Sequence, residues 1–327
     1  HGYGDLILAG GVESMSQAPL LFPDDFVNWL GGLNSARDLP GRLRALARFR
    51  PHMLKPVIGI LCGLTDPVTQ MSMGQTAEKL AWQFGISREE MDAFALRSHQ
   101  RLAAAQQQGN FPHELTPVYD TRGRLWDRDD GVRADTSMEK LARLRPVFDR
   151  RYGKVTAGNS AQITDGAAWL VVASAEACER HGLQPVAEIL DSEWAALDPS
   201  IMGLGPAHAI GHLLARHRMK TGDIDYWEIN EAFAAQVIAC QRALADDAWC
   251  RAHLGHASPG EIPDDRLNVD GGGISIGHPV GASGARILLH LMRVLERERA
   301  ALGIASLCIG GGQGGAMLIR RYQEAAS

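Results

Sequence analysis

The sequence predicts an α/β protein in which short buried strands alternate with helices. From residue 186 onward, apolar runs typical of strands are separated by segments with helical spacing, and this alternation indicates a mixed or parallel sheet covered by helices. A strand-like run that ends in glycines occurs near each end of the chain, at residues 5–11 and 304–312. This repetition indicates a duplicated α/β unit.

Each expected element has a local pattern. Strands are expected where apolar residues run together, at 5–9, 167–173, 186–190, 224–229, 267–269, 304–309 and 315–319. Helices are expected where apolar residues recur at helical spacing, at 76–108, 207–216, 232–245 and 283–297. Within the first of these segments, Ser87 followed by Glu90 forms a capping-box pattern. In such a fold, functional groups are expected at the turns that join strands to helices.

Composition and charge argue against several classes of protein. Of the 327 residues, 45% are hydrophobic and 22% are charged, which is the balance of a folded enzyme. Thirty-three basic and 38 acidic residues give a net charge of −5, so no overall positive field attracts nucleic acid. Apolar runs such as residues 57–64 are far shorter than the ~20 residues of a membrane span. The five cysteines include no CxxC pair, which indicates neither a disulfide framework nor a zinc knuckle and favours the reducing cytoplasm.

Turns after three of the expected strands contain residues capable of catalysis. These turns lie in residues 228–233, 268–286 and 308–315. In the first, Asn230 or Glu231 taken alone is best interpreted as a helix N-cap. In the second, His278 lies among glycines with little side-chain packing to explain it, which favours a functional role. In the third, Cys308 leads into a glycine turn whose N–H groups can stabilise an anion, although most single cysteines are buried small hydrophobes.

The order of these blocks resembles the thiolase family along essentially the whole chain. The resembling blocks are Gly10–Ser16, Met73–Glu78, Leu144–Pro146, Thr156–Ser160, Asn230–Phe233, Gly277–Pro279 and Cys308–Gly312. The resemblance implies duplicated α-β-α-β-α layers with an inserted loop lobe. It also implies cleavage of a 3-ketoacyl-CoA by coenzyme A, or the reverse Claisen condensation of two acyl-CoA molecules.

The same resemblance implies that the first half of the fold is incomplete in this sequence. Residues 1–11 and 151–185 are expected to be a remnant of the N-terminal half, residues 12–150 the inserted CoA-binding lobe, and residues 186–327 the C-terminal half. In the family, the nucleophilic cysteine precedes the Gly-Gly-Val-Glu-Ser block, which begins here at Gly10. We therefore expect an N-terminally truncated chain whose nucleophile lies upstream and which is inactive alone.

Four residues match positions with catalytic roles in the family. His278 resembles the base that activates the nucleophilic cysteine and lines the first oxyanion hole. Cys308 resembles the second cysteine, which moves a proton on and off the α-carbon of acetyl-CoA. Asn230 is similar to the asparagine that holds a water of the first oxyanion hole, and Gly310 to the residue whose N–H forms the second. The resemblance implies no metal and no cofactor, because coenzyme A is a substrate.

Three further residues are expected to contact CoA or the acyl chain, namely Met73, Ser160 and Arg133. Many members have a serine where this chain has Ala161, and short-chain members often have a histidine where it has Ser72. These departures, together with the arginine-rich lobe, make the chain resemble members that act on longer acyl chains, the branch similar to the trifunctional β-subunit.

Two alternatives from other classes remain open at this point. A ketoacyl synthase shares the duplicated fold, but it would normally have a second histidine where this chain has Cys308. A non-catalytic acyl-CoA or lipid-binding partner of a β-oxidation complex is consistent with the missing nucleophile. Members of the family are usually dimers or tetramers, so a homo-oligomer is expected.

The segment Arg37–Lys55 is strongly basic and has an amphipathic pattern. Leu39, Leu43, Leu46 and Ala47 recur at helical spacing, and six basic residues accompany the single acid Asp38. The plainest interpretation is a solvated surface helix. The pattern also fits contact with an anionic membrane surface or with a β-oxidation partner.

Overall fold

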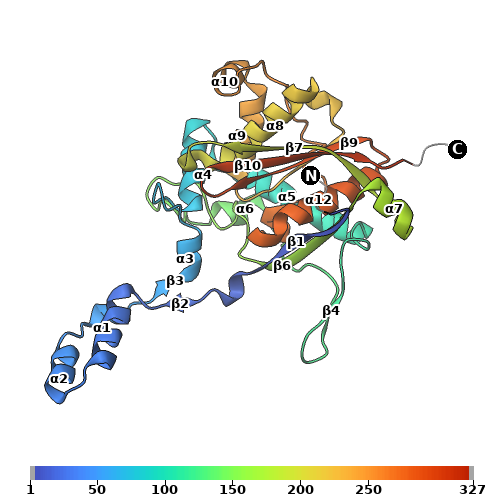
Figure 1. Ribbon diagram of the computed structural model, residues 1–327. Coiled ribbons are helices and arrows are strands. Elements are labelled where there is room, and N and C mark those ends of the chain that lie inside the picture. The colour runs from blue at the N-terminus through green and yellow to red at the C-terminus, as the bar shows by residue number, and fades with distance from the viewer. Residues whose placement is uncertain (1–3, 324–327) are drawn as a thin grey trace.

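One buried helix, α12 (Val280–Arg297), lies between two β-sheets (Figure 1). The computed structural model describes residues 4–323. Strands β1 (Leu6–Ser14) and β6 (Asp165–Ala173) form the first sheet as an antiparallel pair. The second sheet has the strand order β7 (Ala187–Ala196), β10 (Gln313–Arg321), β9 (Leu302–Ile309) and β8 (Tyr226–Ile229). Only β8 and β9 run parallel, so this sheet is mixed, which confirms the prediction from the alternating pattern.

The packing of α12 explains the glycines of β1. Ile287, Leu291 and Leu295 are spaced four residues apart and pack into a buried apolar cluster beneath the second sheet. The start of the helix lies directly against the first sheet. A Cβ atom on Gly11 would lie 2.0 Å from the carbonyl oxygen of Gly281, so only glycine allows this close approach.

Helix α8 (Gly205–His217) covers the opposite face of the second sheet, and α9 (Ala234–Ala245) packs beside it. The order through the molecule is therefore sheet, helix, sheet, helix. The smaller helices are α3 (Gly59–Gly63), α6 (Met138–Ala142), α7 (Ala175–His181), α10 (Asp247–His253) and α11 (Gly273–Ile276). Single turns of 3-10 helix occur at Met15–Gln17, Pro51–Leu54, Pro199–Leu204 and Thr221–Asp223. A small hairpin is formed by β4 (Val118–Tyr119) and β5 (Leu125–Trp126).

Residues 12–150 do not form one inserted lobe, in contrast to the expected division. Helices α4 (Met73–Gln83) and α5 (Arg88–Gln108) pack on α9, and their Leu80 and Phe94 belong to the main core. These two helices replace the single helical segment expected at 76–108, because Gly85 turns the chain with a φ of +61°. The capping box of Ser87 and Glu90 is confirmed at the start of α5.

The part of this region that does leave the body is an arm at residues 19–63 (Figure 1). Strands β2 (Leu20–Leu21) and β3 (Val57–Ile58) pair at its base, and helices α1 (Asp24–Ser35) and α2 (Leu39–Ala47) pack on each other farther out. The amphipathic pattern thus correctly predicts α2. Its apolar stripe is exposed, with Leu39 at 70% and Leu43 at 57% of full exposure. Within residues 4–323, no helix combines the length and the apolar character needed to cross a membrane.

Two predicted strands differ from the structure. Residues 267–269 form no strand, because Leu267 makes only a single parallel bridge to Trp227 before the chain turns. Strand β1 continues past Ala9 through both glycines to Ser14, since β6 pairs with it along its whole length. The face of β1 turned away from α12 is exposed, as Leu8 at 64% shows.

Candidate active site

Asn230 and Cys308 lie at the same edge of the second sheet. Strands β8 and β9 are parallel neighbours, with Ile229 opposite Ser306, so their carboxyl ends meet. The backbone N–H of Asn230 donates to the carbonyl of Ser306 over 2.9 Å, which joins the end of β8 to β9 two residues before Cys308. Both side chains are buried. The sheet therefore places Asn230 and Cys308 at the ends of two neighbouring strands.

His278 reaches this edge from the turn that precedes α12. Its Nε2 atom lies 3.3 Å from Nδ2 of Asn230, and its Nδ1 atom lies 2.6 Å from the hydroxyl of Ser283. Burial, together with the positive charge of Arg286, lowers the pKa of His278 to about 4. At neutral pH the imidazole is therefore uncharged and able to accept a proton.

The glycine turn after β9 borders the same region. Burial raises the pKa of the Cys308 thiol to about 12, so the thiol carries its proton at neutral pH. A Cβ atom on Gly310 would meet only the sulfur of Met73, at 3.7 Å, which leaves open space above the Gly310 backbone. The structure thus brings Met73, at the start of α4, beside the turn that carries Gly310.

Glu231, the residue after Asn230, is bonded to three other segments of the chain. Its carboxylate accepts hydrogen bonds from Ser98 Oγ at 2.6 Å, from Asn268 Nδ2 at 2.9 Å and from the N–H of Ile274 at 3.2 Å. A Cβ atom on Gly272 would lie 2.5 Å from the carboxyl carbon of Glu231, which explains a glycine at that position. Glu231 is therefore not the helix cap that its place in the sequence suggests, because its side chain fixes the turn leading to His278.

Comparison with known families identifies the chain. The model of the thiolase N-terminal domain matches residues 1–176, and that of the thiolase C-terminal domain matches residues 183–321. The chain belongs to the thiolase family. It is 40% identical over 326 residues to a protein of Staphylococcus aureus (strain COL) named "probable acetyl-CoA acyltransferase", covering 98% of this chain and 74% of that relative.

Solved thiolase structures match the fold closely. Human mitochondrial 3-ketoacyl-CoA thiolase superposes with a TM-score of 0.82 at 35% identity, over 98% of this chain and 73% of that one. The Bacillus anthracis acetyl-CoA acetyltransferase gives a TM-score of 0.81, also at 35% identity and with the same coverage of both chains. The human enzyme in complex with CoA gives 0.79 at 36% identity, over 98% of this chain and 72% of that one. The predicted α/β thiolase fold is therefore confirmed.

In this thiolase, two of the expected CoA-contacting residues make hydrogen bonds that involve neither Asn230 nor His278. The side chain of Arg133 is exposed, while its backbone N–H donates to Nδ1 of the buried His99 at 3.2 Å. The hydroxyl of Ser160 is buried and donates to the carbonyl of Thr156 at 2.7 Å, so it is engaged within its own loop. Neither contact brings these side chains to His278.

Among the described residues, none of the other four cysteines is hydrogen-bonded to His278. All five cysteines are within the described residues, and each is a free thiol. Cys62 is exposed on α3 and Cys178 is half-buried on α7. Burial raises the pKa of Cys240 to about 12 and that of Cys250 to about 11. Cys250 lies buried on α10, where the side chain of Asp246 caps the helix and the helix packs on α9.

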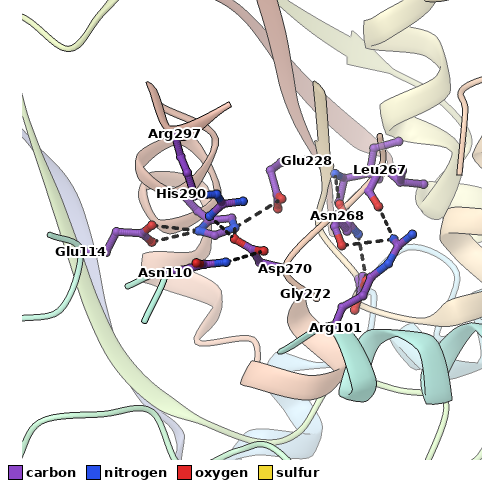
Figure 2. A network of polar contacts seen from close by, with 12 residues as sticks. Arg101, Asn110, Glu114, Glu228, Leu267, Asn268, Asp270, Gly272, His290 and Arg297 are labelled. Carbon is purple, nitrogen blue, oxygen red and sulfur yellow. Dashed lines mark hydrogen bonds and ion pairs between the residues drawn. The ribbon is translucent and has the colours of Figure 1, made fainter. Parts of the chain in front are cut away.

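Figure 2 shows a buried polar network in which His290 and Arg297 face Glu114, Asp270 and Glu228. His290 of α12 approaches Glu114 with Nδ1 at 3.0 Å, and its Nε2 lies 3.5 Å from Asp270 and 3.9 Å from Glu228. Arg297 pairs with the same Asp270 at 2.6 Å. Burial raises the pKa of Glu228 to about 8, so it is protonated at neutral pH. The network brings α12 close to Glu228 on β8, the strand that precedes Asn230.

Sequence reasoning did not identify Ser283 or the network around His290. A signal was present, because Ser283, Arg286, His290 and Arg297 recur at intervals of three, four and seven along a helix that is largely apolar. Polar residues at helical spacing on a buried helix indicate partners on another element. The partners themselves, such as Glu114, come from distant loops and have no local signal. Within residues 4–323, no group of three or more potential ligands is arranged to hold a metal ion.

Proposed function

We propose that this chain holds the acyl-transfer site of a 3-ketoacyl-CoA thiolase. The observation that carries the proposal is the placement of Asn230, His278 and Cys308 around one sheet edge, with His278 3.3 Å from Asn230, in a chain that belongs to the thiolase family. An enolate forms during cleavage or condensation, and such chemistry needs a base, a proton carrier and fixed donors. These three side chains and the Gly310 backbone supply those groups.

The geometry supports a definite assignment of protons during thiolysis. His278 takes the proton of a nucleophilic thiol onto Nε2, and the thiolate attacks C3 of the 3-ketoacyl-CoA. The C2–C3 bond then breaks, its electron pair passes to C2, and Cys308 donates its proton there to form acetyl-CoA. Cys308 suits this step because its raised pKa keeps the thiol protonated at neutral pH. The thiol of CoA gives its proton to the Cys308 thiolate, and the resulting CoA thiolate attacks the acyl-enzyme thioester. The bond from the acyl carbon to the enzyme sulfur breaks, and the released nucleophilic thiolate recovers the proton held on Nε2 of His278.

We place the nucleophilic thiol outside these five cysteines. An activated nucleophile needs a base beside it and a lowered pKa. Cys240 and Cys250 have raised pKa values instead, because both are buried. Cys62 is on the projecting arm, and Cys178 is on α7. Cys308, at the end of β9, is assigned to the proton transfer.

Thiolysis with intact-mass detection tests the proposal. The 327-residue chain is incubated with CoA and a 3-ketoacyl-CoA, and both acetyl-CoA release and protein acylation are followed. A version that also carries the remaining length of the matched relatives is expected to turn over, and His278→Ala should lower its kcat/KM by roughly 10²–10⁴-fold. Turnover with an adduct on one of the five cysteines would move the nucleophile into this chain. Acyl-CoA binding without turnover in both versions would favour the alternative function, an acyl-CoA or lipid-binding partner in a β-oxidation complex.

We infer a preference for longer acyl chains, as in the branch similar to the trifunctional β-subunit. Support comes from Ser72, where short-chain members often have histidine, and from the arginine-rich arm. Met73 borders the open space above Gly310 and is flexible enough to pack along an alkyl chain. The measurement is kcat/KM for 3-ketoacyl-CoA substrates of four to sixteen carbons. Values highest at four carbons would overturn the preference.

We propose that the arm docks on an anionic lipid surface. The apolar stripe of α2 is exposed, and basic residues, including Arg44 and Arg48, flank it. Sedimentation with phosphatidylglycerol vesicles should be lost in the Arg44→Glu/Arg48→Glu variant. The matched control reverses two exposed arginines of the 120–128 loop, Arg122→Glu and Arg128→Glu, and should sediment like the wild type. Equal sedimentation of both variants would rule out this docking, and pull-down of a β-oxidation protein in its place would assign the arm to that partner.

We also propose that the protein works as a homo-oligomer in the cytoplasm. The free thiols of all five cysteines fit a reducing compartment. The exposed outer face of the β1–β6 sheet, with Leu8 and Val171 at 64% and 65% exposure, fits burial against another surface. Light scattering on the purified protein should give a mass that is a multiple of the monomer. A monomer at all concentrations would contradict it.

A further inference from the structure

We infer that Ser283 is the positioning residue that holds the proton of His278 on Nδ1 and leaves Nε2 free to act as the base. The inference rests on the proposed role of His278 in acyl transfer and adds the group that makes the correct nitrogen available. Ser283 is fully buried at the start of α12, five residues after His278, and its hydroxyl lies 2.6 Å from Nδ1.

The hydroxyl has a second partner that decides the direction of its proton. Ser283 Oγ lies 3.0 Å from the carbonyl oxygen of Pro279, which can only accept a hydrogen bond. The hydroxyl has one proton, which it donates in a hydrogen bond to this carbonyl. An oxygen that donates to Pro279 can only accept from His278, so the imidazole must carry its proton on Nδ1.

The contact on the other side of the ring requires the same arrangement. The amide nitrogen of Asn230, which is a donor, faces Nε2 at 3.3 Å. A donor in this position needs a lone pair on Nε2 and therefore a proton on Nδ1. Ser283 and Asn230 thus select one tautomer from opposite edges of the ring.

The start of α12 keeps this arrangement rigid. The carbonyl of Pro279 also accepts from the backbone N–H groups of Ala282 and Ser283, at 2.8 and 2.9 Å, which closes the first helical turn. His278, Pro279 and Ser283 therefore form one unit whose geometry is set by the helix. When Nε2 takes the proton of a thiol, the S–H bond breaks and sulfur keeps the electron pair. The resulting imidazolium still donates from Nδ1 to Ser283, so this contact is kept, and only the amide of Asn230 must turn away from the protonated Nε2.

Nuclear magnetic resonance of ¹⁵N-histidine in the 327-residue chain reads the tautomer directly. At pH 7, Nδ1 of His278 should give the shift of a protonated nitrogen and Nε2 that of an unprotonated one. The signals of His278 are assigned by their absence in His278→Gln. A proton on Nε2 in the wild type would overturn the inference, whether or not the protein shows thiolase activity.

Variants of Ser283 separate positioning from a merely structural role. Ser283→Ala removes the acceptor and should move the tautomer balance toward Nε2–H, whereas Ser283→Thr keeps the hydroxyl and should restore the wild-type spectrum. Ser306→Ala is the matched control, because Ser306 is buried at the same sheet edge but donates to Gly315, at 2.7 Å. In the active protein, kcat should fall about 10–100-fold for Ser283→Ala with KM unchanged. An Nδ1–H spectrum retained in Ser283→Ala would contradict the inference, and the wild-type spectrum decides if that variant does not fold.

Discussion

The sheet edge that carries Asn230 and the arm at residues 19–63 are built in opposite ways. At the sheet edge the polar side chains are buried and several are bonded to other elements, as Glu231 shows with partners on α5, on the 268 turn and on α11. In the arm, α1 and α2 pack chiefly on each other, and their apolar residues remain exposed. The geometry of the sheet edge therefore depends on contacts between residues distant in sequence, while the surface of the arm depends on the local spacing of apolar residues alone.

The largest difference between the two regions is expected for Glu231. Glu231→Ala leaves the side chains of Ser98 and Asn268 and the N–H of Ile274 without their buried acceptor, so the free energy of unfolding should fall by about 3–5 kcal/mol. Glu231→Gln keeps the shape and one acceptor oxygen and should cost less. Urea unfolding followed by circular dichroism measures both. A loss below about 1 kcal/mol for the alanine variant would mean that this turn is held by other contacts.

Acid should destabilise the site and spare the arm. The pKa of His278 is lowered to about 4 in the folded state, against about 6.5 when unfolded, so the unfolded chain binds the extra proton between these values. The contribution of His278 to the free energy of unfolding is fully present above pH 6.5 and is lost as the pH falls toward 4. At pH 5 the loss amounts to about 2 kcal/mol.

Two variants test this pH dependence by urea unfolding at pH 7.5 and pH 5. His278→Gln should lose less stability than the wild type on acidification. His290 provides the control of opposite sign, because hydrogen bonding to Glu114 and nearby carboxylates raise its pKa against the effect of burial. A raised pKa stabilises at low pH, so His290→Gln should lose more stability than the wild type on acidification. Identical pH dependence in both variants would contradict these assignments.

The smallest effect is expected in the arm. Leu43 is exposed on α2, so Leu43→Ser should change the free energy of unfolding by less than about 0.5 kcal/mol. The same change at Leu291, which is fully buried on α12, should cost more than about 3 kcal/mol. Comparable losses at the two positions would show that the arm is packed against another surface.

Much of the fold could be predicted from local sequence. Apolar runs located the strands of the second sheet, and the spacing of Leu39, Leu43 and Leu46 located α2. The division of residues 12–150 could not be predicted, because the packing of α4 and α5 on α9 joins segments more than 120 residues apart in sequence.

For the site, the sequence marked the residues that stand out by chemical type, His278 and Cys308, and the glycines around them. It could not show that Glu231 faces inward or that Ser283 holds His278. From sequence alone, a carboxylate at the end of a strand is explained equally well as a helix cap or as a buried hydrogen-bond acceptor. A serine at the start of a helix is likewise explained without any partner outside the helix. Only the partners distinguish these interpretations, and the partners of Glu231 lie on other elements.

The proposed role of Cys308 as proton carrier is measured by the exchange of the methyl protons of acetyl-CoA in deuterated water, because this reaction isolates the proton transfer. The version that also carries the remaining length of the matched relatives should catalyse the exchange, and Cys308→Ala in that version should lower the rate by roughly 10²-fold or more. Cys178→Ala, a free thiol on α7, should exchange at the wild-type rate. Wild-type exchange in Cys308→Ala would contradict the assignment of this sheet edge as an acyl-CoA site with Cys308 as its proton carrier.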